Sequence, residues 1–168
     1  EDHEDQYFGK QVIYRGDIAV AAKLGFDGPP RPFDLTLKLQ GCADAGLLFT
    51  LGSHMWTCEI PILQFGTDAQ KERYLKPLAV GTALGCFCLT EPQVGSDAAA
   101  ITTRADRDGD GYVLNGVKQF ITTGKHADTA IVFAVTDRSA GKKGITGFVV
   151  DTRTPGYIVA RVEDKLGQ

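Results

Sequence analysis

The chain has 168 residues, of which 43% are hydrophobic and 23% are charged, a composition typical of a folded domain and unlike that of disordered or fibrous chains. Its 18 basic and 21 acidic side chains give a formal net charge of −3, which argues against a general nucleic-acid binder. The longest apolar run, residues 130–135, is far shorter than the roughly 20 residues of a membrane span, and the acidic amino end does not resemble a secretory signal, so we expect a cytoplasmic protein.

The amino-terminal part of the chain divides into two segments of different composition. Residues 1–32 mix charged residues with Gly and Pro and end in a stiff Gly-Pro-Pro-Arg-Pro run, so we expect a linker or irregular segment with at most two helical turns, over 17–24. In residues 33–82 apolar side chains recur mostly at helical intervals. This spacing predicts a helical domain with helices over about 34–45 and 46–63.

A third helix has the clearest start signal in the chain. The Thr67 hydroxyl can accept the Gln70 N–H while the Gln70 side chain reaches back to the Thr67 N–H, the arrangement of a capping box. We therefore expect a helix from Thr67 to about Leu75. Pro77 is expected to end it.

Residues 83–168 change to the pattern of β structure, beginning with an extended run near Leu84 to Leu89. Residues 112–120 predict a hairpin with a type I′ turn at Asn115-Gly116, because that dipeptide tolerates positive φ at both positions. Further strands are predicted over 129–135, 147–150 and, after a Thr-Pro-Gly turn, 157–160. The predicted fold class is α+β, with an amino-terminal helical segment followed by a small β barrel or sandwich.

Several patterns resemble functional sites but have simpler structural explanations. Residues 106–111, Asp-Arg-Asp-Gly-Asp-Gly, match the first half of a calcium loop, but Val117 stands where a bidentate Glu belongs, so we expect a tight turn between strands. Ser53 and His54 pair a nucleophile with a base, but their side chains diverge on a helix. The spacing of the other histidines and of the cysteines matches no metal motif. We expect the cysteines to be buried, reduced thiols.

Two loop segments carry the functional signal. Residues 87–97 read Phe-Cys-Leu-Thr-Glu-Pro-Gln-Val-Gly-Ser-Asp, in which a strand ends and Gly95-Ser96 offers backbone donors that could cradle a pyrophosphate. The alternative is an ordinary surface turn capped by Asp97. Residues 119–124 place an aromatic ring and two hydroxyls at the end of a strand. Because Rossmann and P-loop glycine motifs are absent from the sequence, a nucleotide cofactor would have to be held in another way.

Together these segments closely resemble the acyl-CoA dehydrogenase family. Thr-Glu-Pro at 90–92 and Gly-Ser-Asp at 95–97 are followed by Leu-Asn-Gly-x-Lys-x-Phe-Ile-Thr at 114–122, in the family's order and spacing. Residues 65–78 resemble the last amino-terminal helix of the family. The resemblance covers about residues 36–168. The change of pattern between residues 82 and 83 is where we expect the helical domain to give way to the β domain.

The resemblance implies FAD as the cofactor and an acyl-CoA or acyl-carrier thioester as the substrate. By motif position, the cofactor-binding residues would be Leu89, Thr90, Gly95, Ser96, Phe120, Ile121 and Thr122, and the substrate-binding residues would be Phe87 and Ser96. Thr90 and the neighbouring backbone would bond the flavin near N1 and O2, and Thr122 would bond it near N5. Ser96 would bind the pyrophosphate, and Phe120 would lie against the isoalloxazine ring.

The sequence also departs from the family pattern. Phe87 and Phe120 stand where many members have Tyr and Trp, and Thr123 stands where Asn is common. The family's general-base Glu is expected outside this chain, in a carboxyl-terminal helical domain, so no catalytic residue is assigned here. We expect a homo- or hetero-oligomer that supplies that domain, and an electron-transfer flavoprotein or another acceptor as redox partner.

Three functions remain open from the sequence. The first is the flavin-binding portion of an oxidoreductase that desaturates an acyl thioester between its α and β carbons. The second is a non-catalytic binding or assembly subunit of the same fold. The third is a flavin oxidase or monooxygenase on the same scaffold.

Overall fold

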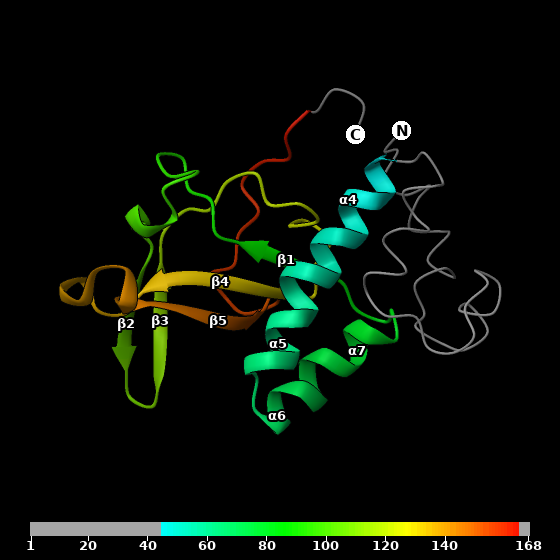
Figure 1. Ribbon diagram of the computed structural model, residues 1–168, viewed down its shortest axis with the longest axis horizontal. Coiled ribbons are helices and arrows are strands. Elements are labelled where there is room, and N and C mark those ends of the chain that lie inside the picture. Colours follow the sequence, from blue (N-terminus) through cyan, green and yellow to red (C-terminus); the bar gives the residue numbers. More distant parts are fainter. Residues whose placement is uncertain (1–44, 165–168) are drawn as a thin grey trace.

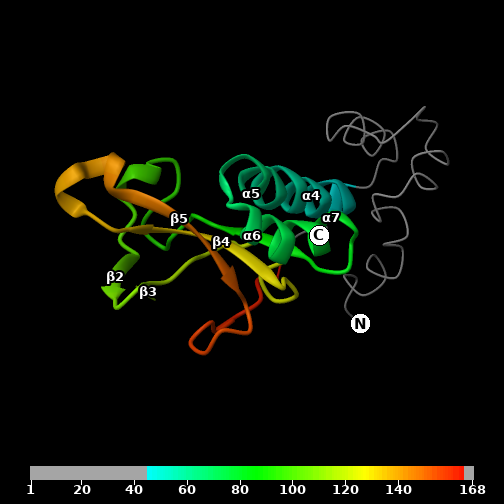
Figure 2. The ribbon, with the colours of Figure 1, turned by 90° about the horizontal axis from the view of Figure 1, so that it is seen from below.

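The computed structural model describes residues 45–164. Within this range two helical rods pack on one face of a five-stranded mixed sheet (Figures 1 and 2). The α+β class predicted from the sequence is confirmed. The predicted linker over 1–32, its helical turns over 17–24 and nearly all of the predicted helix over 34–45 lie outside the described residues.

The first rod is one continuous helix that covers the predicted 46–63. It consists of α4 (Ala45–His54), a π-helical turn (Met55–Glu59) and α5 (Ile60–Phe65). Its buried apolar side chains recur every three or four residues, which gives the helix one face for the sheet. They are Leu51, Met55, Cys58 and Ile62.

The second rod begins at the predicted capping box. The Gln70 N–H donates to the Thr67 hydroxyl at 3.2 Å, and the Thr67 N–H donates to the Gln70 side chain at 2.9 Å. The rod then runs through α6 (Asp68–Gln70), a π-helical turn (Lys71–Leu75) and α7 (Lys76–Ala79).

The expectation that Pro77 ends this helix is wrong, because the helix continues to Ala79. Pro77 is the second residue after the π-helical turn, and Pro61 holds the same place after the first one. In an α-helix interior a proline removes one hydrogen bond and its ring clashes with a carbonyl of the preceding turn. A π-helical turn already interrupts that bonding pattern, so a proline directly after it starts a new α turn at little cost.

The sheet is built around β4 (Thr129–Val135). This strand pairs in parallel with β1 (Gly85–Cys88) and in antiparallel with β5 (Ile145–Asp151). The end of β4 also pairs with β2 (Arg104–Asp108), which forms a hairpin with β3 (Gly111–Asn115). The strands predicted over 129–135 and 147–150 are confirmed.

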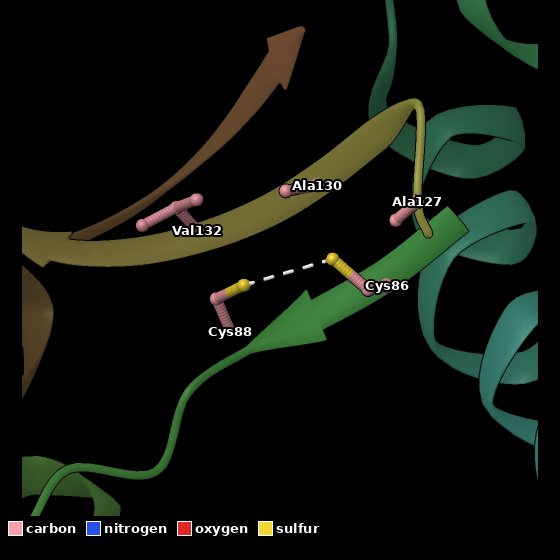
Figure 3. Packing of buried hydrophobic residues seen from close by; sticks show 5 residues of the cluster. All are labelled: Cys86, Cys88, Ala127, Ala130 and Val132. Carbon is pink, nitrogen blue, oxygen red and sulfur yellow. Dashed lines mark hydrogen bonds between the residues drawn. The ribbon is translucent and has the colours of Figure 1, made fainter. Parts of the chain in front are cut away.

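β4 is buried on both faces, which explains its unbroken apolar sequence. Towards the helices, Ile131 packs with residues of both rods in a cluster of four buried side chains: Cys58, Ile62, Leu78 and Ile131. On the opposite face a second cluster contains Cys86, Cys88, Ala127, Ala130 and Val132 (Figure 3). The Cys86 and Cys88 sulfur atoms lie 3.8 Å apart on one side of β1, and both are free thiols, as is the buried Cys58. The expectation of buried, reduced thiols is confirmed for these three cysteines, and Cys42 lies outside the described residues.

The predicted hairpin at Asn115-Gly116 is wrong. The chain instead turns at Gly109 and Asp110, so β2 and β3 pair with Asp108 opposite Gly111. Gly109 has a φ of +56°, which a two-residue hairpin loop requires and glycine provides without strain. The Asp/Gly run is therefore the inter-strand turn that we expected there in place of a calcium loop.

Gly116 does not have a positive φ, so its backbone conformation does not require a glycine. Lack of space for a side chain does. A Cβ at this position would lie 2.2 Å from the Thr103 Oγ1 atom and 2.7 Å from the Thr103 Cα atom. The close approach of these two backbones, rather than a turn, accounts for the glycine.

The strand predicted over 157–160 is also not formed within residues 45–164. The turn at residues 154–156 is present, with a Tyr157 N–H donating to the Thr154 carbonyl at 3.1 Å. Tyr157 then packs against the Cys86 cluster beneath the sheet. The chain therefore leaves the edge of β5 instead of pairing along it. No helix within residues 45–164 is long and apolar enough to cross a membrane.

Replacing Gly116 with Ala tests the close approach to Thr103. We expect the free energy of unfolding in urea to fall by about 2 kcal/mol, because the added methyl group has to displace a backbone as well as a side chain. Gly111→Ala is the matched control in the same hairpin, since a Cβ there meets only the Asp108 carbonyl oxygen at 3.7 Å. Equal stability of the two variants would contradict the packing described for Gly116.

Candidate active site

A cleft of about 400 Å³ lies between the first helical rod and the ends of the strands. The helix contributes one wall, and the segments after β1 and β3 contribute the other. The lining residues are Phe49, Gly52, Ser53, Trp56, Thr57, Phe87, Thr90, Phe120, Ile121 and Thr122. The structure thus brings five residues that the family resemblance singled out, Phe87, Thr90, Phe120, Ile121 and Thr122, to one place.

Thr90 reaches the cleft because β1 ends at Cys88 and a tight turn follows. Glu91 and Val94 exchange backbone hydrogen bonds of 3.0 Å in both directions, with Pro92 at the first central position of the turn. Val94 is buried and fixes the turn to the body of the domain. Thr90 is therefore held between a strand end and a closed turn, which leaves its side chain at the cleft.

The second loop segment is strained where it meets the cleft. Phe120 and Thr123 have positive φ values of 58° and 64°, which non-glycine residues rarely adopt. Strain of this kind persists only where surrounding contacts impose it, and it is common at ligand sites. Here the Gln119 N–H donates to the Thr90 carbonyl at 2.9 Å, and the Gly124 N–H donates to the Ile121 carbonyl at 3.1 Å. Phe120 lines the cleft in this conformation, and the residue is 61% exposed.

Phe87 connects the cleft to the core. Its ring packs edge-on against Phe133 with centroids 5.1 Å apart, and it contacts the cluster between helices and sheet. A residue held by the core on one side and lining the cleft on the other forms a rigid apolar wall.

The other candidate residues lie away from the cleft lining. Leu89 is half-buried and its carbonyl accepts a hydrogen bond of 3.1 Å from Lys118. Gly95 and Ser96 follow the turn on the exposed surface, and a Cβ on Gly95 would have no atom within 4 Å. Gly95 and Ser96 do not line the cleft, whereas Thr90 and Phe120 do. A ligand that contacts all four residues therefore has to extend from the cleft along the surface.

The helical wall of the cleft was not predicted from the sequence. Phe49, Ser53 and Trp56 are spaced by four and three residues and thus lie on one helix face, opposite the buried stripe. Trp56 is 42% exposed, and solvent-facing aromatic residues at this spacing are the one signal that could have suggested a ligand. Gly52 leaves room in that wall, since a Cβ there would meet only Trp56, at 4.0 Å.

Ser53 and His54 diverge as predicted. Ser53 lines the cleft, whereas His54 is buried and accepts the Gly85 N–H on its Nδ1 atom at 2.8 Å. The Nε2 atom of His54 lies 3.1 Å from a Glu59 carboxylate oxygen. His54 therefore fixes the helix to the start of β1 and does not serve the cleft.

Directly behind Thr90, the buried Glu91 carboxylate is enclosed by donors. One oxygen accepts from the Thr102 N–H at 2.7 Å and from the Thr102 hydroxyl and the Gln93 amide. The other accepts from the Thr103 N–H and hydroxyl and from the Lys118 ammonium at 2.9 Å. We call the four donor residues, Gln93, Thr102, Thr103 and Lys118, the Glu91 cage.

The cage keeps Glu91 charged although only 3% of the residue is exposed. Burial on its own would raise the carboxyl pKa, but the Thr103 hydroxyl, Lys118 and the backbone N–H groups of Thr102 and Thr103 outweigh it and lower the pKa to about 2. A carboxylate that is ionised and fully hydrogen-bonded at neutral pH is a poor proton acceptor there. Its place in the fold is structural.

Comparison with known proteins assigns the family. The model of the acyl-CoA dehydrogenase N-terminal domain matches residues 36–82, and the model of the acyl-CoA dehydrogenase middle domain matches residues 86–168. The chain belongs to the acyl-CoA dehydrogenase family.

Individual relatives agree with this assignment. The chain is 52% identical over 125 residues to a short-chain specific acyl-CoA dehydrogenase of Megasphaera elsdenii, an alignment that covers 74% of this chain and 33% of that protein. The solved butyryl-CoA dehydrogenase of the same organism superposes with a TM-score of 0.79 and 43% identity over 92% of this chain and 42% of the other. A Mycobacterium smegmatis glutaryl-CoA dehydrogenase in complex with FADH2 gives a TM-score of 0.77 and 32% identity, covering 97% and 44% of the two chains. The chain thus spans less than half the length of these proteins.

The Glu91 cage predicts how stability depends on acid. Because the carboxyl pKa falls from an ordinary 4.5 to about 2 on folding, its stabilisation is complete above pH 4.5 and is lost as the pH falls towards 2. We expect this group to account for a loss of about 3 kcal/mol of unfolding free energy over that interval, measured by urea denaturation at successive pH values.

The double variant Glu91→Leu, Lys118→Met serves as control, because it removes both charges of the buried pair. Its stability should decline less between pH 4.5 and pH 2 than that of the unaltered chain. Parallel curves for the two proteins would show that the acid sensitivity comes from other carboxylates.

Proposed function

We propose that this chain forms the flavin-binding and acyl-thioester-binding part of an FAD-dependent acyl-CoA dehydrogenase. The observation that carries the proposal is the convergence of Phe87, Thr90 and the strained segment at Phe120 on one cleft, opposite an aromatic helix face. The names of the similar proteins support the reaction class, and two of them specify a short-chain or butyryl substrate. The proposed reaction removes hydrogen from the α and β carbons of a short acyl thioester.

The residues of the cleft suit a planar, hydrogen-bonding ring system. Phe120 offers an exposed aromatic face, and the Thr90 and Thr122 hydroxyls can donate to ring nitrogen and carbonyl groups. FAD, when bound, supplies the acceptor for the hydride that leaves the substrate. We assign Thr90, Phe120, Ile121 and Thr122 to its isoalloxazine ring, with the Leu89 backbone beside Thr90.

The exposed Gly95-Ser96 turn is assigned to the extended part of the cofactor. The residues that line the cleft are assigned to the isoalloxazine ring, so the pyrophosphate of the dinucleotide needs donors outside the cleft. Backbone N–H groups and a small hydroxyl on an open surface provide such donors. Ser96 is also placed beside the thioester carrier, since both ligands would leave the cleft along this surface.

The acyl group is assigned to the helical side of the cleft. Phe87 and Trp56 form apolar walls, and Gly52 leaves space between them and the ring site. Apolar walls exclude water from the path of the hydride, which protects the transfer from competing hydrolysis and proton exchange.

The α-proton acceptor is proposed to come from another part of the assembly. No Asp or Glu from residues 45–164 lines the cleft, and the nearest fixed carboxylate in the loop, Glu91, is already fully bonded. We therefore propose that a Glu from a helical domain, in another segment or a partner chain, completes the site. An electron-transfer flavoprotein or a similar acceptor would reoxidise the flavin. We further propose that residues 33–82 and 83–168 act as the helical and β domains of this unit.

Thr90→Val tests the flavin assignment. Replacing the hydroxyl with a methyl group leaves the shape nearly unchanged but removes a polar partner, so FAD affinity should fall by about 1 to 3 kcal/mol in a fluorescence-quenching titration. Thr154→Val is the control, because Thr154 is exposed and lies outside the cleft lining. Equal affinity of the Thr90 variant and the unaltered chain would contradict the role of Thr90.

The second test concerns the missing proton acceptor. With a short-chain acyl-CoA and a dye acceptor, we expect no measurable dehydrogenation by this chain alone, since loss of a general base typically costs about 10²- to 10⁴-fold in rate. A carboxyl-terminal helical domain of the family, supplied in trans, should raise turnover, and replacing its Glu with Gln should abolish it. Robust turnover by the 168-residue chain without a second polypeptide would contradict the proposal about the base.

A further inference from the structure

Lys118 is a largely buried cation that lies near the cleft without contributing to its lining. Its side chain is only 11% exposed and does not line the cleft. The ammonium group donates to the Glu91 carboxylate at 2.9 Å and to the Leu89 carbonyl at 3.1 Å. Lys118 thus contacts the residues on either side of Thr90.

The bond to the Leu89 carbonyl fixes the orientation of a second group. The Leu89 carbonyl and the Thr90 N–H belong to one peptide unit, and no cis peptide bond occurs within residues 45–164. In a trans peptide these two groups point in opposite directions. With the carbonyl drawn towards Lys118, the Thr90 N–H is held facing away from it.

The next peptide is fixed from the same side. The Thr90 carbonyl accepts the Gln119 N–H at 2.9 Å, so consecutive carbonyls of the loop are bonded by consecutive residues, Lys118 and Gln119. No hydrogen bond from the Thr90 N–H to another group is found in the described part of the chain. Thr90 therefore combines a backbone N–H of fixed orientation with a side chain that lines the cleft.

Glu91 keeps the cation in place and limits its field. Thr102 and Thr103 hold the carboxylate, so Lys118 cannot swing away without leaving a buried charge unpaired. The neutralised pair projects little net charge into the cleft. The cleft instead experiences the dipole of the Leu89–Thr90 peptide. Lys118 polarises the carbonyl of this peptide, and this polarisation makes the Thr90 N–H a stronger hydrogen-bond donor.

We propose that Lys118 is a positioning residue for the flavin, which holds the Leu89–Thr90 peptide so that the Thr90 N–H donates to the pyrimidine edge of the isoalloxazine ring. This inference rests on the proposed function of the cleft. Reduction increases negative charge at that edge, so a fixed donor stabilises reduced flavin more than oxidised flavin. Lys118 would thereby raise the reduction potential without touching the cofactor.

The test compares Lys118→Met and Lys118→Arg with the unaltered full chain. Affinity for FAD is measured by fluorescence quenching, and the midpoint potential of the bound flavin is measured by dye-coupled reduction. For Lys118→Met we expect affinity for oxidised FAD to fall about tenfold, affinity for reduced FAD to fall further, and the midpoint potential to become more negative. Lys142→Met, on an exposed turn remote from the cleft, should change none of these quantities.

Lys118→Arg guards against loss of folding, because it keeps a cation beside Glu91. The longer side chain and planar guanidinium do not reproduce the compact tetrahedral donor geometry of the ammonium at the two acceptors, so we expect a smaller shift of the potential in the same direction. If Lys118→Met does not fold, the Arg variant decides by the presence or absence of that shift.

The outcomes separate this inference from the proposed function. Failure of the unaltered chain to bind FAD would contradict the proposed function itself. Binding of FAD with a midpoint potential that neither variant moves would overturn only the role of Lys118. Equal weakening of oxidised and reduced FAD would likewise overturn it, because a purely structural contribution lowers both affinities together.

Discussion

The buried ion pair between Glu91 and Lys118 is the contact on which the β wall of the cleft depends. It joins three stretches of chain that share no regular secondary structure at this point: the turn after β1, residues 102–103 before β2, and the segment after β3. Burying a carboxylate and an ammonium is costly unless both are nearly saturated with hydrogen bonds. Here the backbone and hydroxyl donors of two threonines meet that requirement. The ion pair therefore links these three stretches of chain through directional hydrogen bonds, which restrict their relative positions more than apolar contacts would.

The helical wall uses a different device. The π-helical turn at residues 55–59 lies where the helix passes the sheet, with Met55 and Cys58 buried and Trp56 and Thr57 at the cleft. A π-helical turn rotates the residues after it relative to an α-helix, so it can direct neighbouring side chains to two surfaces at once. The interrupted hydrogen bonding costs little because Pro61, the second residue after the turn, has no N–H that needs a partner.

Local signals in the sequence were reliable where one short segment determines the outcome. The Thr67-Gln70 capping box and the apolar strand over 129–135 formed as predicted because each depends on its own residues or on general burial. Asn115-Gly116 misled because the same dipeptide that suits a turn also suits a close backbone contact. The contact with Thr103, thirteen positions earlier in the chain, distinguishes a close backbone contact from a turn. A pattern read from neighbouring residues alone does not include that contact. The cage around Glu91 and the helical wall were unpredicted for the same reason, since they are tertiary contacts between segments far apart in the chain.

Three titratable groups near the cleft and the sheet, Cys58, Tyr157 and Glu91, have pKa values shifted away from the range needed for proton transfer at neutral pH. Burial, with the nearby Cys86 and Glu59, raises the pKa of the Cys58 thiol to about 12. Burial and the neighbouring cysteines also raise the pKa of the Tyr157 hydroxyl, while Glu91 stays ionised. The protonated Cys58 thiol, the protonated Tyr157 phenol and the ionised, fully hydrogen-bonded Glu91 carboxylate are therefore poorly suited to exchange a proton near pH 7. What the described residues supply is position: oriented hydroxyls, a strained aromatic ring and an apolar wall. These features suit the role that we propose for the cleft, which is to bind and align a redox cofactor and a thioester while a group from outside the cleft supplies acid–base catalysis.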